Sequence, residues 1–332
     1  MNDYAFHRKK LPYIRYWSIF VLYNPSQILI IMLKLKLSIV CTLLCAFAFA
    51  NVSNSEKDAL IALYNATDGP SWKNKWDLNE PVEKWYGVIV DRGNVIGIDL
   101  AFNNLEGDIP AEIGDLTNLV SLNLFRNKIS GEIPESLGNL ERLENLNLAF
   151  NALEGNLPKN LSNLKSLLYL HVYMNRLTGT IPSSIGELSQ LAVLGLYNND
   201  FTGEIPKEIG KLENLEELLL SSNNLTGKLP TSISKLKDLK VLSVFDNQLM
   251  GTVPNGIAEL TKLEELVLAK NGFFGTLPNN MAQLTNLRVL MIGDNAFQGE
   301  LAELRDQFPN IEQFDVSNVS TRGVLATLDT ED

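Results

Sequence analysis

Leucine and isoleucine recur at fixed intervals over residues 95–310, and the interval is 24 residues. One copy, residues 119–142, reads LVSLNLFRNKISGEIPESLGNLER. Asparagine holds one place in all nine copies: Asn103, Asn127, Asn151, Asn175, Asn199, Asn223, Asn247, Asn271 and Asn295. Glycine follows four residues later, from Gly107 to Gly299, and proline holds a further place from Pro110 to Pro278 but not at Ala302. A fixed period of this length indicates a solenoid in which each repeat forms one coil.

Within each coil, the apolar spacing predicts one short strand. Leu122 and Leu124 are two residues apart, so they share one face of an extended segment. Stacked coils then pair these strands into a parallel sheet. Each asparagine follows its strand, where its amide can satisfy backbone groups that the turn removes from the ladder. A later apolar pair, such as Ile113 and Leu116, is expected to fill the core from the opposite side of the coil.

The repeated pattern LxxLxLxxNxLxGxIPxxLxxLxx resembles the leucine-rich repeats of plant extracellular proteins, namely receptor-like kinase ectodomains and polygalacturonase inhibitors. The resemblance covers residues 95–310. It implies an α/β solenoid, a right-handed superhelix with a parallel β-sheet on its concave face. It also implies 3-10 or other short helical segments on the convex face, an α-helical N-terminal cap, and interaction rather than catalysis.

The first 50 residues read as a segment separate from the repeats. Residues 32–50 have a basic start, an apolar run and a small-residue cleavage site before Asn51, which indicates a secretory signal peptide. Residues 1–31 fit neither a domain nor an ordinary signal, and we expect synthesis to begin at Met32. Alternatively, residues 1–50 are retained and anchor the protein in a membrane, although their charge-free apolar run is short for a membrane-spanning helix. The protein is therefore expected to be secreted or held at the cell surface.

Residues 51–94 are expected to form the N-terminal cap. Ser55 precedes an acid-first segment, residues 56–65, that predicts a helix. The segment from Trp85 to Val88 resembles the cap motif Cys-x-Trp-x-Gly-Val-x-Cys, but the cysteines are absent, as in bacterial or other microbial members. Three tryptophans are expected to bury the first coil instead, with a sugar-stacking platform as the alternative: Trp72, Trp76 and Trp85. Residues 311–332 are expected to form the C-terminal cap and tail.

The composition of the chain limits which partners and reactions are expected. The chain carries a net charge of −11, and residues 51–332 hold 22 basic and 38 acidic residues. This acidity argues against nucleic acid as a partner. Both cysteines lie in the leader, and His171 is the one histidine after it. We therefore expect no metal site, no cofactor and no enzyme activity.

Two carboxylate pairs could serve glycosidase chemistry: Glu216/Glu217 and Glu264/Glu265. One column of the predicted strands, however, runs Glu216, Lys240, Glu264 and Arg288, and another runs Asp246, Lys270 and Asp294. These alternating signs favour surface ion pairs between neighbouring coils over catalysis.

The expected concave face differs between its two halves. Repeats two to five place aromatic and large side chains between the leucines, whereas repeats six to nine place mostly charges there. We predict that the first group binds a protein, peptide or glycan ligand, because exposed aromatic patches are uncommon without a partner. Cross-strand stabilisation of the sheet is the structural alternative. The predicted site consists of Phe125, Phe150, Tyr169, His171, Tyr173, Met174 and Tyr197.

Two other functions remain open at this stage. A structural or adhesive surface protein would use many weak contacts and would not depend on one patch. An ice-binding protein would need regular threonine columns on a flat face, and the threonines here give only a broken array: Thr178, Thr180, Thr202, Thr226, Thr252 and Thr276.

Overall fold

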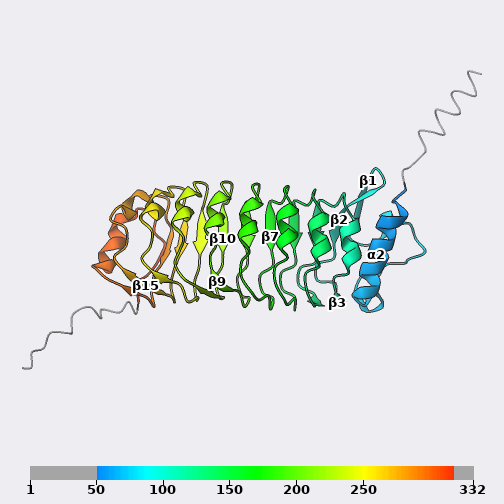
Figure 1. Ribbon diagram of the computed structural model, residues 1–332, viewed down its shortest axis with the longest axis horizontal. Helices are drawn as coiled ribbons and strands as arrows, with labels where there is room; N and C mark the ends of the chain where they lie inside the picture. The colour runs from blue at the N-terminus through cyan, green and yellow to red at the C-terminus, as the bar shows by residue number, and fades with distance from the viewer. Residues whose placement is uncertain (1–50, 318–332) are drawn as a thin grey trace, which may run out of the picture. The chain divides into compact units, whose positions relative to one another are not determined.

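The computed structural model describes residues 51–317, which form a row of stacked coils closed at the N-terminal side by a helix (Figure 1). The upstream segment 1–31, the signal peptide 32–50 and the tail 318–332 lie outside the described residues. Among the residues that are described, no helix is long and apolar enough to cross a membrane.

Each coil contributes one strand to an 11-stranded sheet. The first two strands are antiparallel, and every later pair is parallel and in register, so that Leu122, Leu146 and Leu170 are neighbours in one row. The outer face of this sheet is called the sheet face below. In sheet order the strands are β1 (Val88–Asp91), β2 (Asn94–Asp99), β4 (Ser121–Asn123), β6 (Asn145–Asn147), β7 (Tyr169–His171), β8 (Val193–Gly195), β10 (Glu217–Leu219), β12 (Val241–Ser243), β14 (Glu265–Val267), β16 (Val289–Met291) and β18 (Gln313–Asp315).

The opposite side of each coil is a short 3-10 helix, as the later apolar pairs predict. Most of these helices follow a proline in extended conformation, as Pro134 is before η4. In chain order they are η3 (Ala111–Asp115), η4 (Glu135–Asn139), η5 (Lys159–Asn163), η6 (Ser183–Glu187), η7 (Lys207–Lys211), η8 (Thr231–Lys235), η9 (Asn255–Glu259), η10 (Met281–Gln283) and η11 (Leu301–Gln307).

Short lateral strands join neighbouring coils between the main sheet and the 3-10 helices. They form three small parallel sheets among the described residues. Their members are β3 (Glu106–Asp108) with β5 (Lys128–Ser130), β9 (Thr202–Glu204) with β11 (Asn224–Thr226), and β13 (Met250–Gly251) with β15 (Gly272–Gly275) and β17 (Ala296–Phe297).

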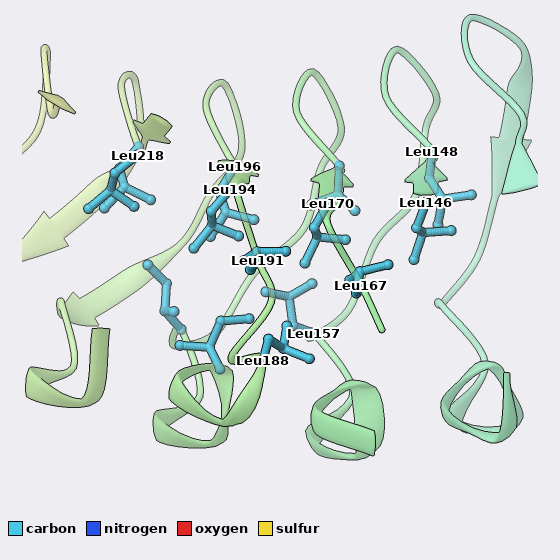
Figure 2. Packing of buried hydrophobic residues seen from close by; sticks show 14 of the residues in the cluster. Leu146, Leu148, Leu157, Leu167, Leu170, Leu188, Leu191, Leu194, Leu196 and Leu218 are labelled. Atoms are coloured by element: carbon cyan, nitrogen blue, oxygen red, sulfur yellow. The ribbon is translucent and has the colours of Figure 1, made fainter. Parts of the chain in front are cut away.

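The core fills the space between the main sheet and the 3-10 helices. Leucines such as Leu146, Leu170 and Leu194 project from the strands toward Leu188 and its equivalents (Figure 2), and these side chains are fully buried. Burial of one such side chain stabilises the fold by about 1.5–3 kcal/mol. Because one coil cannot cover its own apolar face, the stabilisation comes from stacking.

The asparagine row runs through the turn after each main strand. Asn199 shows the arrangement: its Oδ1 accepts the backbone N–H of Leu177 at 3.0 Å, and its Nδ2 donates to the carbonyls of Val172 and Leu196, both at 3.0 Å. The residue before each asparagine adopts a left-handed backbone, as Asn198 does with φ 52°. This position therefore turns the chain in every coil, while the amide of the asparagine ties neighbouring coils together.

The N-terminal cap is helix α2 (Asn54–Ala66) with η1 (Gly69–Ser71) and η2 (Val82–Lys84). The sequence assigned the helix cap to Ser55, which is wrong: the cap is Ser53, whose side chain accepts the backbone N–H of Glu56. The glutamate side chain in turn accepts the backbone N–H of Val95 at 3.1 Å and so ties the helix to β2. The helix is anchored by this buried carboxylate as well as by its apolar side.

The cap tryptophans are buried as expected. Trp72, Trp76 and Trp85 are each less than 5% exposed, and their rings meet those of Tyr64 and of one another at centroid distances of 4.8–5.9 Å. Each indole N–H donates to a backbone carbonyl, such as that of Tyr86 for Trp76. Rings that are buried and hydrogen-bonded in this way cover the first coil, and they are not available to stack on a sugar.

Candidate functional site

The predicted site residues come from adjacent coils of the sheet face. On β7, Tyr169 and His171 flank the buried Leu170, so their side chains project from the sheet. Tyr173 follows where the strand ends, and Tyr197 holds the same place one coil later. The alternation that buries the leucine is therefore what presents the aromatic side chains.

The rings form a continuous series. Phe125 meets Phe150 at 5.3 Å between ring centroids, Phe150 meets Tyr173 at 5.8 Å, and Tyr173 meets Tyr197 at 4.2 Å. His171 lies 5.8 Å from Tyr173 and 6.5 Å from Tyr169. The first two contacts are edge-to-face and the tyrosine pair is stacked, which are the favoured geometries for aromatic pairs. The structure thus brings together six of the seven predicted residues.

Met174 is the exception. It takes no part in a ring contact within residues 51–317, and its sulfur lies 2.9 Å from Nδ2 of Asn198 in the next coil. Met174 is 36% exposed and holds the left-handed position of its coil. It therefore lies in the same row as Phe150, but its side chain contacts Asn198 of the next coil and not a ring.

Two further residues contact these rings and were not predicted from the sequence: Phe102 and Arg126. Phe102 meets Phe125 at 5.1 Å and is 50% exposed. The guanidinium carbon of Arg126 lies 5.6 Å from the centroid of Phe102 and 5.8 Å from that of Phe150. The signal was available, because these three residues are spaced by 24 and fall in one row. We call Phe102, Phe125, Arg126, Phe150, Tyr169, His171, Tyr173 and Tyr197 the aromatic stretch.

Burial perturbs the titration of His171, which lies at the centre of the aromatic stretch. Desolvation lowers the pKa of His171 below its usual 6.5, so the imidazole is neutral at neutral pH. Its Nδ1 is buried and has no hydrogen-bond partner among the described residues. The ring can occupy this place because Gly195 faces it: a Cβ at Gly195 would lie 3.2 Å from Nδ1 and 3.2 Å from Cδ1 of Tyr173. Because Gly195 has no side chain, the imidazole fills the space between it and Tyr173.

The tyrosine pair is partly shielded from solvent. Burial, the neighbouring Tyr173 and a hydrogen bond to its side chain raise the pKa of Tyr197 to about 12. The phenol of Tyr197 therefore stays protonated at neutral pH. The stacked pair offers an apolar ring surface with hydroxyl groups at its edge, which suits contact with a ligand that has both apolar and polar parts.

The second half of the sheet face carries the predicted ion pairs. Lys240 lies 2.6 Å from Glu216, and Arg288 lies 4.0 Å from Glu264 and 2.7 Å from Glu312. These contacts link successive coils, as predicted for surface ion pairs. The pKa of Lys240 is raised by its hydrogen bond to Glu216.

The second predicted column contains Asp246, Lys270 and Asp294, and its first contact, between Asp246 and Lys270, does not form among the described residues. The Nζ of Lys270 lies 5.1 Å from the centroid of the Phe245 ring, and no ion pair joins it to Asp246 in residues 51–317. An exposed ammonium gains as much from an aromatic face as from an exposed carboxylate. No group of three or more histidine, cysteine, aspartate and glutamate side chains in the described part of the chain could hold a metal ion.

Two protein families match the part of the chain that forms these coils. A family described as "Leucine-rich repeat region" matches residues 178–324, and one described as "Leucine Rich Repeat" matches residues 118–140, 142–164 and 166–188. A search of curated proteins finds no significant match.

Similar solved structures include two plant receptors with bound peptides. The peptide hormone receptor RGFR1 in complex with RGF2 is 38% identical, with a TM-score of 0.62, over 64% of this chain and 34% of that chain. The Arabidopsis receptor kinase HAESA, in complex with the peptide hormone IDA and the co-receptor SERK1, is 32% identical, with a TM-score of 0.73, over 80% of this chain and 46% of that chain. The chain thus spans about a third to a half of the length of these receptor chains.

A third similar structure is a plant ice-binding protein. It is 25% identical, with a TM-score of 0.62, over 82% of this chain and 99% of that chain. The family matches, the 24-residue coils and the receptor structures agree with one another. The chain is a leucine-rich-repeat protein with repeats of the plant type.

Proposed function

We propose that this protein is an extracellular recognition module that binds a protein or peptide on the sheet face, with the aromatic stretch as the main contact. The observation that carries the proposal is the unbroken series of rings from Phe102 to Tyr197, which lies outside a core that is already fully packed. Packing of the coils does not need these rings, because later coils keep the same strand register with Ser221, Ala269 and Gly293 in the row of Tyr173 and Tyr197.

The similar receptors support a peptide or protein as the ligand. RGFR1 and HAESA are solved in complex with peptide hormones, and both share the coil geometry of this chain. A recognition module of this kind works outside the cell, which agrees with the signal peptide that the sequence predicts.

The test is binding to a panel of peptides, proteins and glycans, followed by calorimetric titration of each ligand that binds. Tyr173→Ala and Tyr197→Ala should each weaken binding by about 1–4 kcal/mol, because large aromatic residues dominate interface energies. Loss of the stacked pair should cost about 0.5–1.5 kcal/mol of stability beyond lost burial, so both variants should remain folded. Tyr86→Ala is the matched control, since Tyr86 is 48% exposed and lies outside the aromatic stretch.

The outcomes separate the alternatives. Equal affinity in both tyrosine variants and in the control would refute the aromatic stretch as the site and favour an adhesive or structural role. Binding to glycans alone would keep the site and change the ligand class. A ligand that binds equally well to a variant lacking either tyrosine must contact another face.

Ice adsorption is a second candidate, favoured by one observation. Thr180 and Thr202 pair across neighbouring coils at the lateral strands, and both are exposed. The next residue in this register is Asn224, so the threonine array is short. The test is inhibition of ice recrystallisation by the wild-type protein and by Thr202→Tyr. Equal inhibition by the two would show that this face does not bind ice.

A further inference from the structure

Two tyrosines of the aromatic stretch stand side by side in neighbouring coils. The rings of Tyr173 and Tyr197 lie 4.2 Å apart between centroids, with 11° between their planes. A hydrogen bond joins their side chains, so the two hydroxyl groups meet as well as the two ring faces. On either side of Tyr173, the backbone N–H groups of Val172 and Met174 donate to carbonyls of the next coil at 3.0 Å. The stacking of the coils therefore holds the two phenols in contact.

No other pair of tyrosines among the described residues is placed in this way. Residues 51–332 contain five tyrosines. Tyr64 is buried among the cap tryptophans. Tyr86 and Tyr169 are 48% and 41% exposed, and the strands on both sides of Tyr169 carry no tyrosine beside it. The folded chain thus has one place within its described part where two phenols can react with each other.

Oxidation can join two phenols that are in contact. A phenol that loses one electron and one proton becomes a radical, whose unpaired electron is shared between the oxygen and the ring carbons beside the C–O bond. Two such radicals combine by forming a carbon–carbon bond between these ring positions, and the hydrogen at each bonded carbon then moves to the oxygen of its ring. Hydrogen peroxide, acting through a haem peroxidase, accepts the two electrons and two protons and becomes two molecules of water.

We propose that Tyr173 and Tyr197 are a modification site, at which a peroxidase and hydrogen peroxide form an intramolecular dityrosine cross-link. Both side chains are partly exposed, so an oxidant can reach them. They hold the same place in coils whose strands lie about 4.8 Å apart, so the new bond needs movement of the side chains and not of the backbone. The cross-link fixes the coil of β7 to the coil of β8. This inference concerns the covalent chemistry of the pair and does not rest on ligand binding.

The test is oxidation of the folded protein, at low concentration, with a haem peroxidase and hydrogen peroxide. Dityrosine fluorescence should appear in protein that still migrates as a monomer. After proteolysis, mass spectrometry should find the peptides of Tyr173 and Tyr197 joined, with the loss of two hydrogen atoms. The linked protein should unfold at a higher urea concentration, because a bond between residues 24 positions apart restricts the unfolded chain.

Phenylalanine variants assign the reacting groups. Tyr173→Phe and Tyr197→Phe keep both rings and remove one hydroxyl, so either change should abolish the linked peptide and the gain in urea resistance after oxidation. Tyr86→Phe and Tyr169→Phe are the matched controls, because they remove the more exposed phenols, and both should leave the linked peptide unchanged. Oxidation in denaturing urea should greatly reduce the linked peptide, since the unfolded chain no longer holds the two phenols together.

Three results would overturn the inference. Dityrosine found only in dimers, or only through Tyr86 or Tyr169, would mean that exposure and not contact selects the reacting phenol. A bond from Tyr173 to His171, whose ring lies 5.8 Å away, would make the imidazole the partner instead. Absence of dityrosine from the oxidised protein would show that the pair does not react. None of these results contradicts the proposed function, which needs the surface of the rings; normal ligand binding by the alanine variants of the pair would refute that function and leave the cross-link standing.

Discussion

Replacement of Asn199 by alanine tests how the coils are joined. The side chain is 7% exposed and makes three hydrogen bonds at 3.0 Å, one as acceptor and two as donor. The two carbonyls that it reaches keep a second donor after the change, since Asn175 bonds Val172 and Asn223 bonds Leu196. The backbone N–H of Leu177 has no such replacement.

The magnitude follows from this single orphaned donor. A buried N–H without a partner costs about 1–3 kcal/mol, and the two carbonyls add little. Asn199→Ala should therefore lower the free energy of unfolding by about 1–3 kcal/mol. Asn199→Asp keeps the acceptor for Leu177 but turns a carboxylate toward two carbonyl oxygens. Its folded-state pKa should be raised, so the deficit should be large at neutral pH, should shrink as pH falls toward about 4, and should be smallest and constant below that.

The assay is urea unfolding followed by circular dichroism, with amide hydrogen exchange as the local readout. Leu177 should lose protection in the alanine variant, while amides two coils away should not. Asn214→Ala is the control, because its exposed amide makes one bond, to the carbonyl of Ser189 at 2.8 Å. If the two alanine variants unfold at the same urea concentration, the asparagine row does not stabilise the fold as argued.

Three further changes can be predicted. Gly195→Ala should displace His171 and Tyr173, because its Cβ would lie 3.2 Å from each, and titration should show weaker ligand binding with little change in urea unfolding. Lys240→Gln should leave stability nearly unchanged at low and high salt, because its ion pair with Glu216 is exposed; a clear loss in thermal unfolding would contradict this. The lowered pKa of His171 means that the unfolded chain takes up the proton first as pH falls. Wild-type stability relative to His171→Gln should thus be constant above about pH 6.5 and decline below it, and a constant difference down to pH 5 would refute the burial argument.

Periodicity predicted the parts of the fold that repeat. Leu122, Leu124 and Ile113 are buried as their spacing requires, and every interior asparagine that was found by adding 24 bonds to a neighbouring coil. These positions are predictable because the same physical demand recurs in each coil. The start of α2 was misplaced because it occurs once, and two serines, Ser53 and Ser55, both fit an N-cap in the sequence.

Contacts between unlike residues were harder to predict. Arg126 was not predicted, because a cation between Phe102 and Phe150 in one row forms neither an aromatic series nor a column of alternating charge. Lys270 was assigned to an ion pair because its row alternates in charge, but the left-handed turn brings it over Phe245 from another row. Sequence spacing predicts the row in which a side chain lies. The backbone conformation of the turn then determines which residue of a neighbouring row it contacts.

The sheet face therefore carries information that the fold does not require. The inward residues and the asparagines are nearly the same in all coils, so stacking makes the same demand on the early coils as on the late ones. Packing alone gives no reason for rings to gather around Tyr173 and for ion pairs to gather around Lys240. Cross-strand stabilisation would be served by either kind of contact in any coil. Aromatic contacts and ion pairs are separated along one face. A partner that is apolar at one end and charged at the other would account for this separation, which supports a role in recognition.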